Sequence, residues 1–240
     1  MTFACFRWPR YDVMTRLRHD VEAQEREDVM RVLMMAARKG GAGKTTLAAS
    51  LAVAAAQADE TVTLVDIDDQ GSLGDWYARR QDQTAEAVLE YDRDGTGSLR
   101  DRLACIRSSG RASLVLVDTP GRFDETVRDA LRQADLCLLP SRPSILDVQG
   151  TERTADELKA LGRRFSFVIN AVDSRSLSRA VDAAEALAQL GPIYPEWIAQ
   201  RADHLDAITL GLGVSEWKPR SPAADEIRSL WAWVRARMGE

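Results

Sequence analysis

The stretch that decides the fold is Lys39-Gly40-Gly41-Ala42-Gly43-Lys44-Thr45-Thr46. It stands between a continuous apolar run, residues 32–37, and an Ala-rich segment, residues 45–58. Glycines at a strand-to-helix junction let the backbone curl until several N–H groups point inward, and the positive end of the helix also attracts anions. The stretch predicts a phosphate-binding loop in which Lys44 reaches the β- and γ-phosphates and the Thr45 hydroxyl binds Mg²⁺. The alternative is a glycine-rich turn before an ordinary helix.

Strand-like and helix-like runs alternate outward from this loop. Further strands are expected at residues 62–65, 88–91, 114–117, 136–139 and 165–169. Helices are expected at residues 45–58, 99–106, 123–133, 145–161, 177–190 and 223–238. The alternation predicts an α/β fold, a mostly parallel twisted sheet with helices on both faces. Such sheets bind ligands at the carboxyl ends of their strands.

Length and composition narrow the class of protein. The 240 residues suit one compact domain, with or without a short extension, and the net charge of −5 argues against a uniformly basic nucleic-acid binder. A local basic patch remains compatible with that charge. Cys5, Cys105 and Cys137 lie too far apart to suggest a disulfide framework or a metal site, and the last two are expected to be small core residues. No apolar run is long enough to span a bilayer.

Two acidic segments follow predicted strands. Residues 66–72, with the sequence DIDDQGS, come after the strand at 62–65, and Asp118-Thr119-Pro120-Gly121 comes after the strand at 114–117. Acids at the carboxyl ends of parallel strands face the phosphate loop, where Asp118 is expected to hold the hydration shell of Mg²⁺. The alternative is that these acids form polar turns or helix caps.

The loop and the acidic segments resemble the ParA/MinD superfamily of P-loop ATPases, and the resemblance covers about residues 31–238. The common P-loop has glycine where this chain has Arg38, whereas the deviant Walker A loop of the superfamily has an added lysine where this chain has Lys39. The resemblance implies that Lys39 reaches across a dimer interface to the partner's nucleotide, while Lys44 acts within its own chain. A second cation would neutralise charge that grows on the phosphates during transfer. The alternative is that Lys39 is a solvated loop lysine.

The resemblance also implies that ATP and Mg²⁺ are the cofactors. Residues 66–71 resemble the DxDPQG switch segment of the superfamily, with Asp69 in place of proline, so Asp68 is expected to orient the attacking water. The implied Mg²⁺ group is Thr45, Asp68 and Asp118. The residues implied to hold the phosphates are Gly40, Gly41, Ala42, Gly43, Lys44, Thr45 and Thr46.

The match is nearest to small plasmid-type ParA proteins, and it suggests residues for the base and for DNA. Asn170 is implied to read the adenine edge, since an amide offers both a donor and an acceptor; the alternative is a strand-end turn residue. Arg201 and Pro219 are implied to lie near the base. Arg220 falls where related proteins carry a DNA-contacting arginine.

Nonspecific DNA binding needs a cationic surface that neutralises phosphates. Arg179 and Arg220 are the arginines expected to contribute to it, and dimerisation is expected to gather further ones beside them. The full set considered is Arg175, Arg179, Arg220, Arg228, Arg235 and Arg237. The alternative is that these arginines lie on solvated helix faces.

The chain is expected to divide into an N-terminal extension, residues 1–30, and a ParA-like ATPase domain, residues 31–240. The extension is charged and shows only Val13, Leu17 and Val21 at helical spacing, which indicates a weak helix. It lacks an apolar signal segment and is too short for a helix-turn-helix domain. It is either a partner-binding arm or an overextended start, since Met30 directly precedes the domain.

The resemblance implies an ATPase that dimerises with ATP, binds DNA nonspecifically and partitions or positions a DNA-linked cargo, as in plasmid or chromosome segregation. A ParB-like adaptor or another cargo-bound activator is expected to stimulate hydrolysis. The expected location is cytoplasmic and nucleoid-associated, without a membrane partner. His19 and His204 show no paired spacing and are expected to be structural or surface residues.

Three rivals share the fold. A MinD-like membrane-positioning ATPase would need a free amphipathic basic helix, but the apolar face of residues 223–238 is expected to belong to the core. A metal-cluster carrier would need cysteines near the switch loops. A ParA-like ATPase for conjugative transfer or for positioning a protein complex is not distinguished by the sequence.

Overall fold

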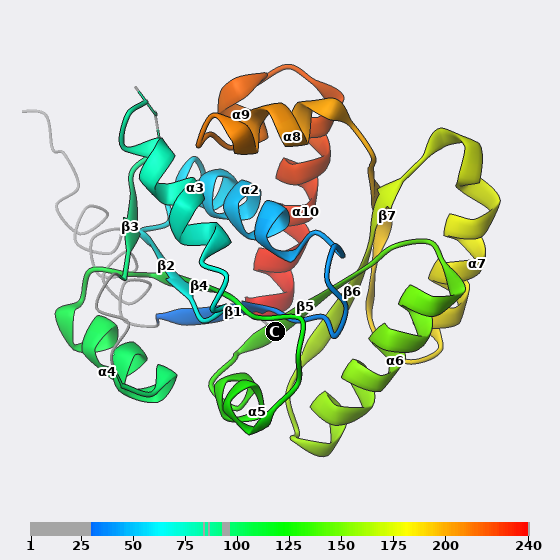
Figure 1. Ribbon diagram of the computed structural model, residues 1–240, viewed down its shortest axis with the longest axis horizontal. Coiled ribbons are helices and arrows are strands. Elements are labelled where there is room, and N and C mark those ends of the chain that lie inside the picture. The colour runs from blue at the N-terminus through cyan, green and yellow to red at the C-terminus, as the bar shows by residue number, and fades with distance from the viewer. Residues whose placement is uncertain (1–29, 84, 86, 93–96, 240) are drawn as a thin grey trace, which may run out of the picture.

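The computed structural model describes residues 30–83, 85, 87–92 and 97–239; the helix expected around Val13, Leu17 and Val21 lies outside them. Seven strands form one sheet in the order β3-β2-β4-β1-β5-β6-β7 (Figure 1), and every pair of neighbours is parallel. The strands are β1 Arg31–Met35, β2 Val62–Asp66, β3 Leu89–Tyr91, β4 Leu114–Asp118, β5 Leu136–Ser141, β6 Phe165–Val172 and β7 Ile193–Ala199. The predicted parallel α/β sheet is confirmed.

Helices cover both faces of the sheet, as predicted (Figure 1). One face carries α2 Lys44–Ala56, α3 Ser72–Arg80, α8 Ala202–Thr209, α9 Val214–Trp217 and α10 Pro222–Gly239. The other face carries α4 Leu99–Ser109, α5 Glu125–Leu131, α6 Ile145–Ala160 and α7 Leu177–Ala188, with the short 3₁₀ turn η1 Ser174–Ser176 before α7.

The central strand β1 shows why the apolar run before the loop forms a buried strand. Leu33 and Met35 enter one hydrophobic core and Val32 and Met34 enter the other, because side chains alternate across a strand. All four side chains are fully buried. A strand with no solvent-facing side is uniformly apolar, which is the pattern that the sequence displays.

Helix α2 is more deeply buried than its sequence suggests. The sequence predicts only an Ala-rich helix at residues 45–58, whereas in the structure every residue from Leu47 to Ala55 is buried. The reason is that α3, α8, α9 and α10 pack over its outer side. A helix enclosed on all sides needs small apolar residues, and the many alanines of this segment allow the close approach.

The C-terminal helix α10 is part of the core, as expected. Its apolar side chains, namely Ile227, Leu230, Trp231, Val234 and Met238, are buried in the same cluster as α2 and β7. The described residues contain no helix that is both long enough and apolar enough to cross a bilayer.

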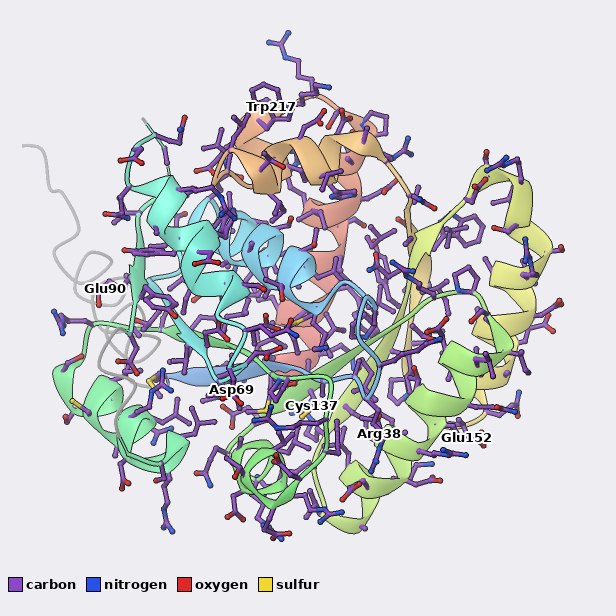
Figure 2. All side chains as sticks on the ribbon, in the orientation of Figure 1. Arg38, Asp69, Glu90, Cys137, Glu152 and Trp217 are labelled. Carbon is purple, nitrogen blue, oxygen red and sulfur yellow. The ribbon has the colours of Figure 1, made fainter. Side chains whose placement is uncertain are left out.

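Two expectations need correction. Cys137 lies buried in β5 near the middle of the sheet (Figure 2), but Cys105 is exposed, because α4 buries only Leu99, Arg102 and Leu103. In addition, β7, α3, α8 and α9 were not expected. The edge strand β7 contains Pro195 and exposed polar positions, which disguise it in the sequence.

Candidate functional site

The phosphate loop connects β1 to α2 and depends on glycine geometry. Gly41 has φ 76° and Gly43 has φ 90°, the left-handed region that glycine adopts at little cost. A Cβ atom on Gly43 would lie 2.3 Å from Nδ2 of Asn170, which leaves no room for a side chain. The loop therefore places its N–H groups and the start of α2 around one small space.

Asn170 supports this loop directly. Its Nδ2 donates a 2.8 Å hydrogen bond to the carbonyl oxygen of Ala42, and its side chain is buried. The β6–β7 pairing is irregular between Ile169 and Val172, and Ala171 has φ 55°, an uncommon value for alanine. This irregularity turns Asn170 toward the loop, while the same residue also lines a neighbouring cavity. A role in reading the base remains a prediction.

Thr45 and Asp118 form the centre of the expected Mg²⁺ site. The Thr45 hydroxyl donates a hydrogen bond to Oδ2 of Asp118, whereas the buried Oδ1 has no hydrogen-bond partner among the described residues. Burial raises the pKa of the Asp118 carboxyl to about 7, and the Thr45 hydroxyl opposes that rise. A buried carboxylate oxygen without a partner beside a threonine hydroxyl fits Mg²⁺, which takes few protein ligands and completes its shell with phosphates and water. The described residues accordingly hold no group of three or more His, Cys, Asp or Glu side chains that could bind a metal.

Asp66 organises the acidic segment, a role that the sequence did not assign to it. Its carboxylate accepts hydrogen bonds from the backbone N–H groups of Asp68 (2.9 Å), Leu73 (3.1 Å) and Gly74 (3.3 Å). Burial raises the pKa of Asp66, and these hydrogen bonds lower it. Asp68 in turn accepts a 3.1 Å bond from the N–H of Gln70, so the segment is a sequence of tight turns that ends at α3.

A cavity of about 530 Å³ joins the loop to both acidic segments. The loop residues line one side, Asp68 and Asp69 a second, and residues 120–122 a third. Lys44 is 8% exposed at its edge; burial lowers its pKa, while Asp118 and Asp68 raise it. A triphosphate placed here would meet Lys44, backbone N–H groups and Thr45, whose hydroxyl donates to the buried Asp118.

The β4 end is fixed beside the loop by close packing. The Thr119 hydroxyl donates a 2.7 Å hydrogen bond to the carbonyl oxygen of Met35 at the end of β1. A Cβ atom on Gly121 would lie 3.2 Å from the backbone nitrogen of Gly40, so a larger residue would push the loop away. These contacts hold the end of β4, which carries Asp118, beside the end of β1 and the phosphate loop.

Lys39 differs from Lys44 in its surroundings. Its side chain is 50% exposed, and its Nζ lies 3.0 Å from Oδ1 of Asp147 in the first turn of α6. The Ser144 hydroxyl donates to the other oxygen of Asp147, which is itself buried. Lys39 is not among the described residues that line the phosphate cavity of its own chain.

Arg38 occupies the position where an ordinary P-loop has glycine, and it serves as an anchor. It forms an ion pair with Glu157 of α6, and its guanidinium lies 4.5 Å from the centre of the Phe123 ring. Glu157 also pairs with Arg128 of α5, so Arg38 sits between α5 and α6 (Figure 2). The two adjacent basic residues therefore differ in their surroundings. Arg38 is anchored to α5 and α6 and holds the loop, whereas Lys39 is half exposed.

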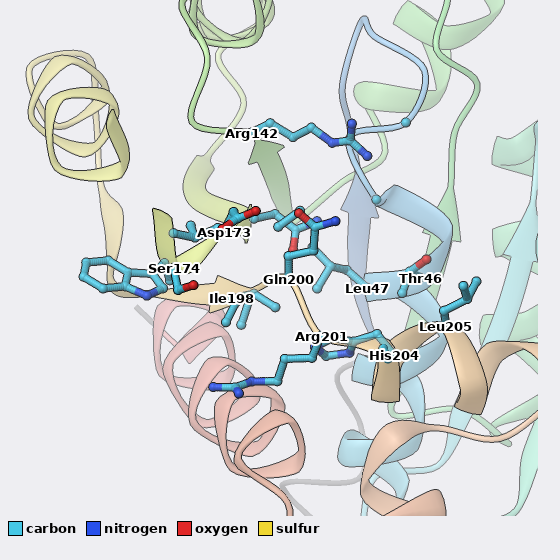
Figure 3. Close-up of a pocket in the computed structure, with 18 of the residues that line it drawn as sticks. Thr46, Leu47, Arg142, Asp173, Ser174, Ile198, Gln200, Arg201, His204 and Leu205 are labelled. Atoms are coloured by element: carbon cyan, nitrogen blue, oxygen red, sulfur yellow. The ribbon is translucent and has the colours of Figure 1, made fainter. Parts of the chain in front are cut away.

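A larger cavity of about 970 Å³ continues from the loop, sharing Gly41, Gly43 and Thr46 with the phosphate cavity (Figure 3). Asn170 and Arg201, the two residues predicted to read or lie near the base, both line it, and their roles toward a base stay predictions. Its other polar or aromatic lining residues were given no ligand role from the sequence, and one of them, His204, was expected to be a structural or surface residue. They include Arg142, Ser174, Trp197, Gln200 and His204. These side chains come from the ends of β5, β6 and β7 and from α8, so no local motif reveals them.

The remaining residues expected near the base or DNA are not brought together within one chain. Pro219 lies with Lys218, Arg220 and Ser221 around a separate small depression and does not line the large cavity. Arg179 is exposed on α7, on the opposite face of the sheet from α8–α10. Arg220 is also exposed.

Several of the other candidate arginines already have acidic partners. Arg175 lies 2.8 Å from Asp173, whose pKa it lowers to about 2. The other pairs are Arg228 with Asp225 at 2.6 Å and Arg235 with Glu60 at 3.4 Å. These pairs reduce the positive charge that the three arginines present.

Comparison with known proteins identifies relatives along most of the chain. The family model described as the CobQ/CobB/MinD/ParA nucleotide binding domain matches residues 33–208. The maintenance of carboxysome distribution protein A of Gloeobacter kilaueensis is 36% identical over 194 residues, which is 80% of this chain and 87% of that protein. The protein ParA of Rhizobium radiobacter is 31% identical and covers 58% of this chain and 63% of its own length. The structure of the MinD cell division protein of Aquifex aeolicus has a TM-score of 0.71 at 20% identity, covering 88% of this chain and 98% of that one.

Proposed function

Since the chain belongs to the CobQ/CobB/MinD/ParA family and is a P-loop ATPase that uses ATP and Mg²⁺, we propose that it positions a cargo inside the cell as an ATP-dependent dimer. The dimer binds DNA without sequence preference, and a cargo-bound activator stimulates its ATP hydrolysis and release. The observation that carries the proposal is the placement of Lys39.

In the proposed dimer, each triphosphate is neutralised by Lys44 of the chain that binds it and by Lys39 of the second chain. Lys44 is buried at the phosphate cavity, whereas Lys39 is half exposed and is held 3.0 Å from Asp147, outside that cavity. A cation in that position supports contact with the triphosphate of a second copy. Two lysines on one triphosphate would stabilise the charge that develops in the transition state.

Within one chain, four residues perform the chemistry. Lys44 holds the β- and γ-phosphates, and Thr45 and Asp118 hold Mg²⁺, which draws charge from the phosphate oxygens. Asp68, at the turn after β2, orients the attacking water. The hydrogen bonds that Asp66 accepts keep that turn in place, so Asp66 is a positioning residue.

The relatives suggest the kind of cargo. The name of the Gloeobacter kilaueensis relative refers to carboxysome distribution, and the alignment covers most of both chains. We therefore place a large protein assembly first among cargoes. Plasmid or chromosome segregation is second, supported by the shorter match to a ParA protein.

The DNA surface is proposed to form around Arg220, an exposed residue in the loop between α9 and α10. Lys218 in the same loop pairs with Asp203 at 2.5 Å. A single loop is a small cationic area, so two copies in a dimer would double it. The nucleoid is the expected location of the ATP-bound form.

Membrane positioning of the MinD kind is less well supported. The apolar face of α10 packs against α2 and β7 and is not available for a lipid surface. Binding to anionic vesicles with ATP would reverse this order of preference.

The test is the mass of the full chain by light scattering with ADP, with ATP, and with ATP plus generic duplex DNA. The proposal predicts a doubled mass with ATP and retention of DNA by that species only. Arg220→Ala should lose DNA while keeping the doubled mass, and Arg107→Ala, an exposed arginine on α4, is the matched control. Doubling without DNA binding by the wild type would contradict the DNA step, and a monomer with ATP would contradict the whole proposal.

A further inference from the structure

His204 is a buried polar side chain without a hydrogen-bond partner in the part of the chain that the structure describes. It lies in the first turn of α8 and is 9% exposed. Both ring nitrogens are buried, and neither has a hydrogen-bond partner among the described residues. Buried polar groups are nearly always hydrogen-bonded, because an unmade bond costs free energy. A nitrogen pair left without partners in the protein points to a ligand.

His204 is one of the residues that line the larger cavity. His204 lines it together with Thr46, Leu47 and Arg201, and Arg142 lies on the opposite side (Figure 3). The cavity is continuous with the phosphate loop, and α8 packs against α2, the helix that begins in that loop. A nucleotide whose phosphates occupy the loop would extend its sugar and base into this space.

The acidic groups near His204 are already engaged. Glu226 accepts hydrogen bonds from Arg201 (2.6 Å) on one oxygen and from the N–H of Ala199 (3.1 Å) on the other. Asp203 accepts from Lys218. Because these carboxylates have other partners, they do not supply the hydrogen bonds that the ring nitrogens of His204 lack among the described residues.

We propose that His204 binds the nucleoside part of ATP through hydrogen bonds from its imidazole. A neutral imidazole has one donor and one acceptor, which suits a ribose hydroxyl or the edge of a purine. The inference rests on ATP binding alone and not on the cargo or DNA steps, so its failure would leave those steps untouched.

The charge state agrees with this role. Burial lowers the pKa of His204; Glu226 opposes that shift, Arg201 adds to it and Asp203 opposes it. The ring is therefore neutral near pH 7 and keeps both a donor and an acceptor.

The test compares two ligands of the full chain in Mg²⁺ by calorimetry. His204→Phe keeps a ring of similar shape and removes both nitrogens. It should weaken ATP binding by about three- to tenfold, the loss of one net hydrogen bond, and leave inorganic tripolyphosphate binding unchanged. His204→Gln, which keeps a donor and an acceptor, should recover part of the loss. Thr209→Ala, an exposed position on the same helix, is the control and should change neither ligand.

Two results would overturn the inference. In the first, His204→Phe binds ATP as tightly as the wild type. In the second, it weakens ATP and tripolyphosphate equally, which would show a structural role. If phenylalanine prevents folding, His204→Leu gives the same comparison.

Analogues then identify the contact. A loss that disappears with 2′-deoxy-ATP or 3′-deoxy-ATP assigns His204 to the sugar, and a loss that persists with both assigns it to the base.

Discussion

The phosphate end of the site and the end that we propose holds the nucleoside, called the nucleoside end below, are built in different ways. The phosphate end uses one continuous loop, in which Gly41 and Gly43 shape the backbone and Lys44 follows directly. The nucleoside end uses side chains from β6, β7 and α8, brought together only by folding. Backbone N–H groups of one short segment can bind phosphates, so a local sequence motif reveals a phosphate site. A sugar or base is bound by side chains, which can come from segments far apart in the chain.

A buried ion pair joins the two ends. Arg80 at the end of α3 and Glu216 in α9 are 3% and 4% exposed, and Nη2 of Arg80 lies 2.6 Å from Oε1 of Glu216. Helix α3 continues the acidic segment of the phosphate end, and α9 packs against α8 of the nucleoside end. The Trp76 indole adds a 3.2 Å bond to the carbonyl of Leu212. The Arg80–Glu216 pair is called the junction below, and substitutions there and at each end test the contrast.

The largest effect is expected at this junction. Glu216→Gln would leave the buried Arg80 guanidinium without a carboxylate, with only neutral hydrogen-bond acceptors such as the carbonyl oxygens of Gly211 and Ala87. We predict that this lowers the free energy of unfolding by about 3 kcal/mol. Urea denaturation measures it. The double variant Arg80→Met with Glu216→Leu should recover only the part of the loss that comes from the unpaired charge, because the N–H groups of Gly213 and Ala87 still lose the carboxylate as their acceptor. Equal losses in the single and double variants would show that packing, not the pair, joins the ends.

The next effect separates backbone recognition from side-chain recognition. Gly43→Ala would place a Cβ atom 2.3 Å from Nδ2 of Asn170 at a φ of 90°, so we predict that ATP binding falls by about five- to 150-fold, which corresponds to strain of about 1–3 kcal/mol. Gly150→Ala in α6, where a Cβ atom meets nothing within 4 Å, is the matched control. Calorimetry with ATP and tripolyphosphate should show the same loss for both ligands. A loss confined to ATP would contradict the assignment of the loop to phosphate.

A smaller effect is expected in the pH dependence of stability, because the Glu216 carboxyl has a different pKa in the folded and unfolded chain. Burial pushes the pKa of Glu216 upward, but hydrogen bonds from Arg80 and from the N–H groups of Gly213 and Ala87 outweigh it, so the folded pKa lies below the ordinary 4.5. The unfolded chain then binds the proton more readily, and this stability is present above pH 4.5 and lost as pH falls below it. We predict a steeper acid loss of stability in wild type than in Glu216→Gln. The measurement is the free energy of unfolding by urea at a series of acidic pH values. The same dependence on pH in both proteins would refute this prediction.

The smallest effect is expected at Asp69, which stands where the DxDPQG segment has proline and forms an exposed ion pair. Asp69 lies 2.7 Å from Arg122, and both side chains are at least half exposed. Exposed pairs contribute little because water screens them, so Asp69→Ala should leave the unfolding midpoint unchanged within error. A clear shift in the midpoint would show that the mouth of the phosphate cavity is more rigid than its exposure indicates.

The same contrast explains what could be predicted from the sequence. The loop, the strand before it and Asp118 were identified because motif and neighbouring elements are adjacent in the chain, and the predicted helix 45–58 matches α2 closely. Conversely, β7 was missed because Pro195 and exposed positions hide its periodicity, and Asp66 was missed because its partners are backbone groups. His204 has no neighbouring signal in the sequence; only burial and the cavity single it out.

The central claim is that Lys39 serves the nucleotide of a second copy, and mixing two inactive variants tests it most directly. Lys39→Ala keeps Asp68 but lacks the shared lysine, and Asp68→Ala keeps Lys39 but cannot orient water. In a mixed dimer, the Asp68→Ala chain would supply Lys39 to an intact catalytic site on the other chain. We predict that the mixture hydrolyses ATP faster than the sum of the two variants measured separately, whereas a mixture no faster than that sum would contradict the claim.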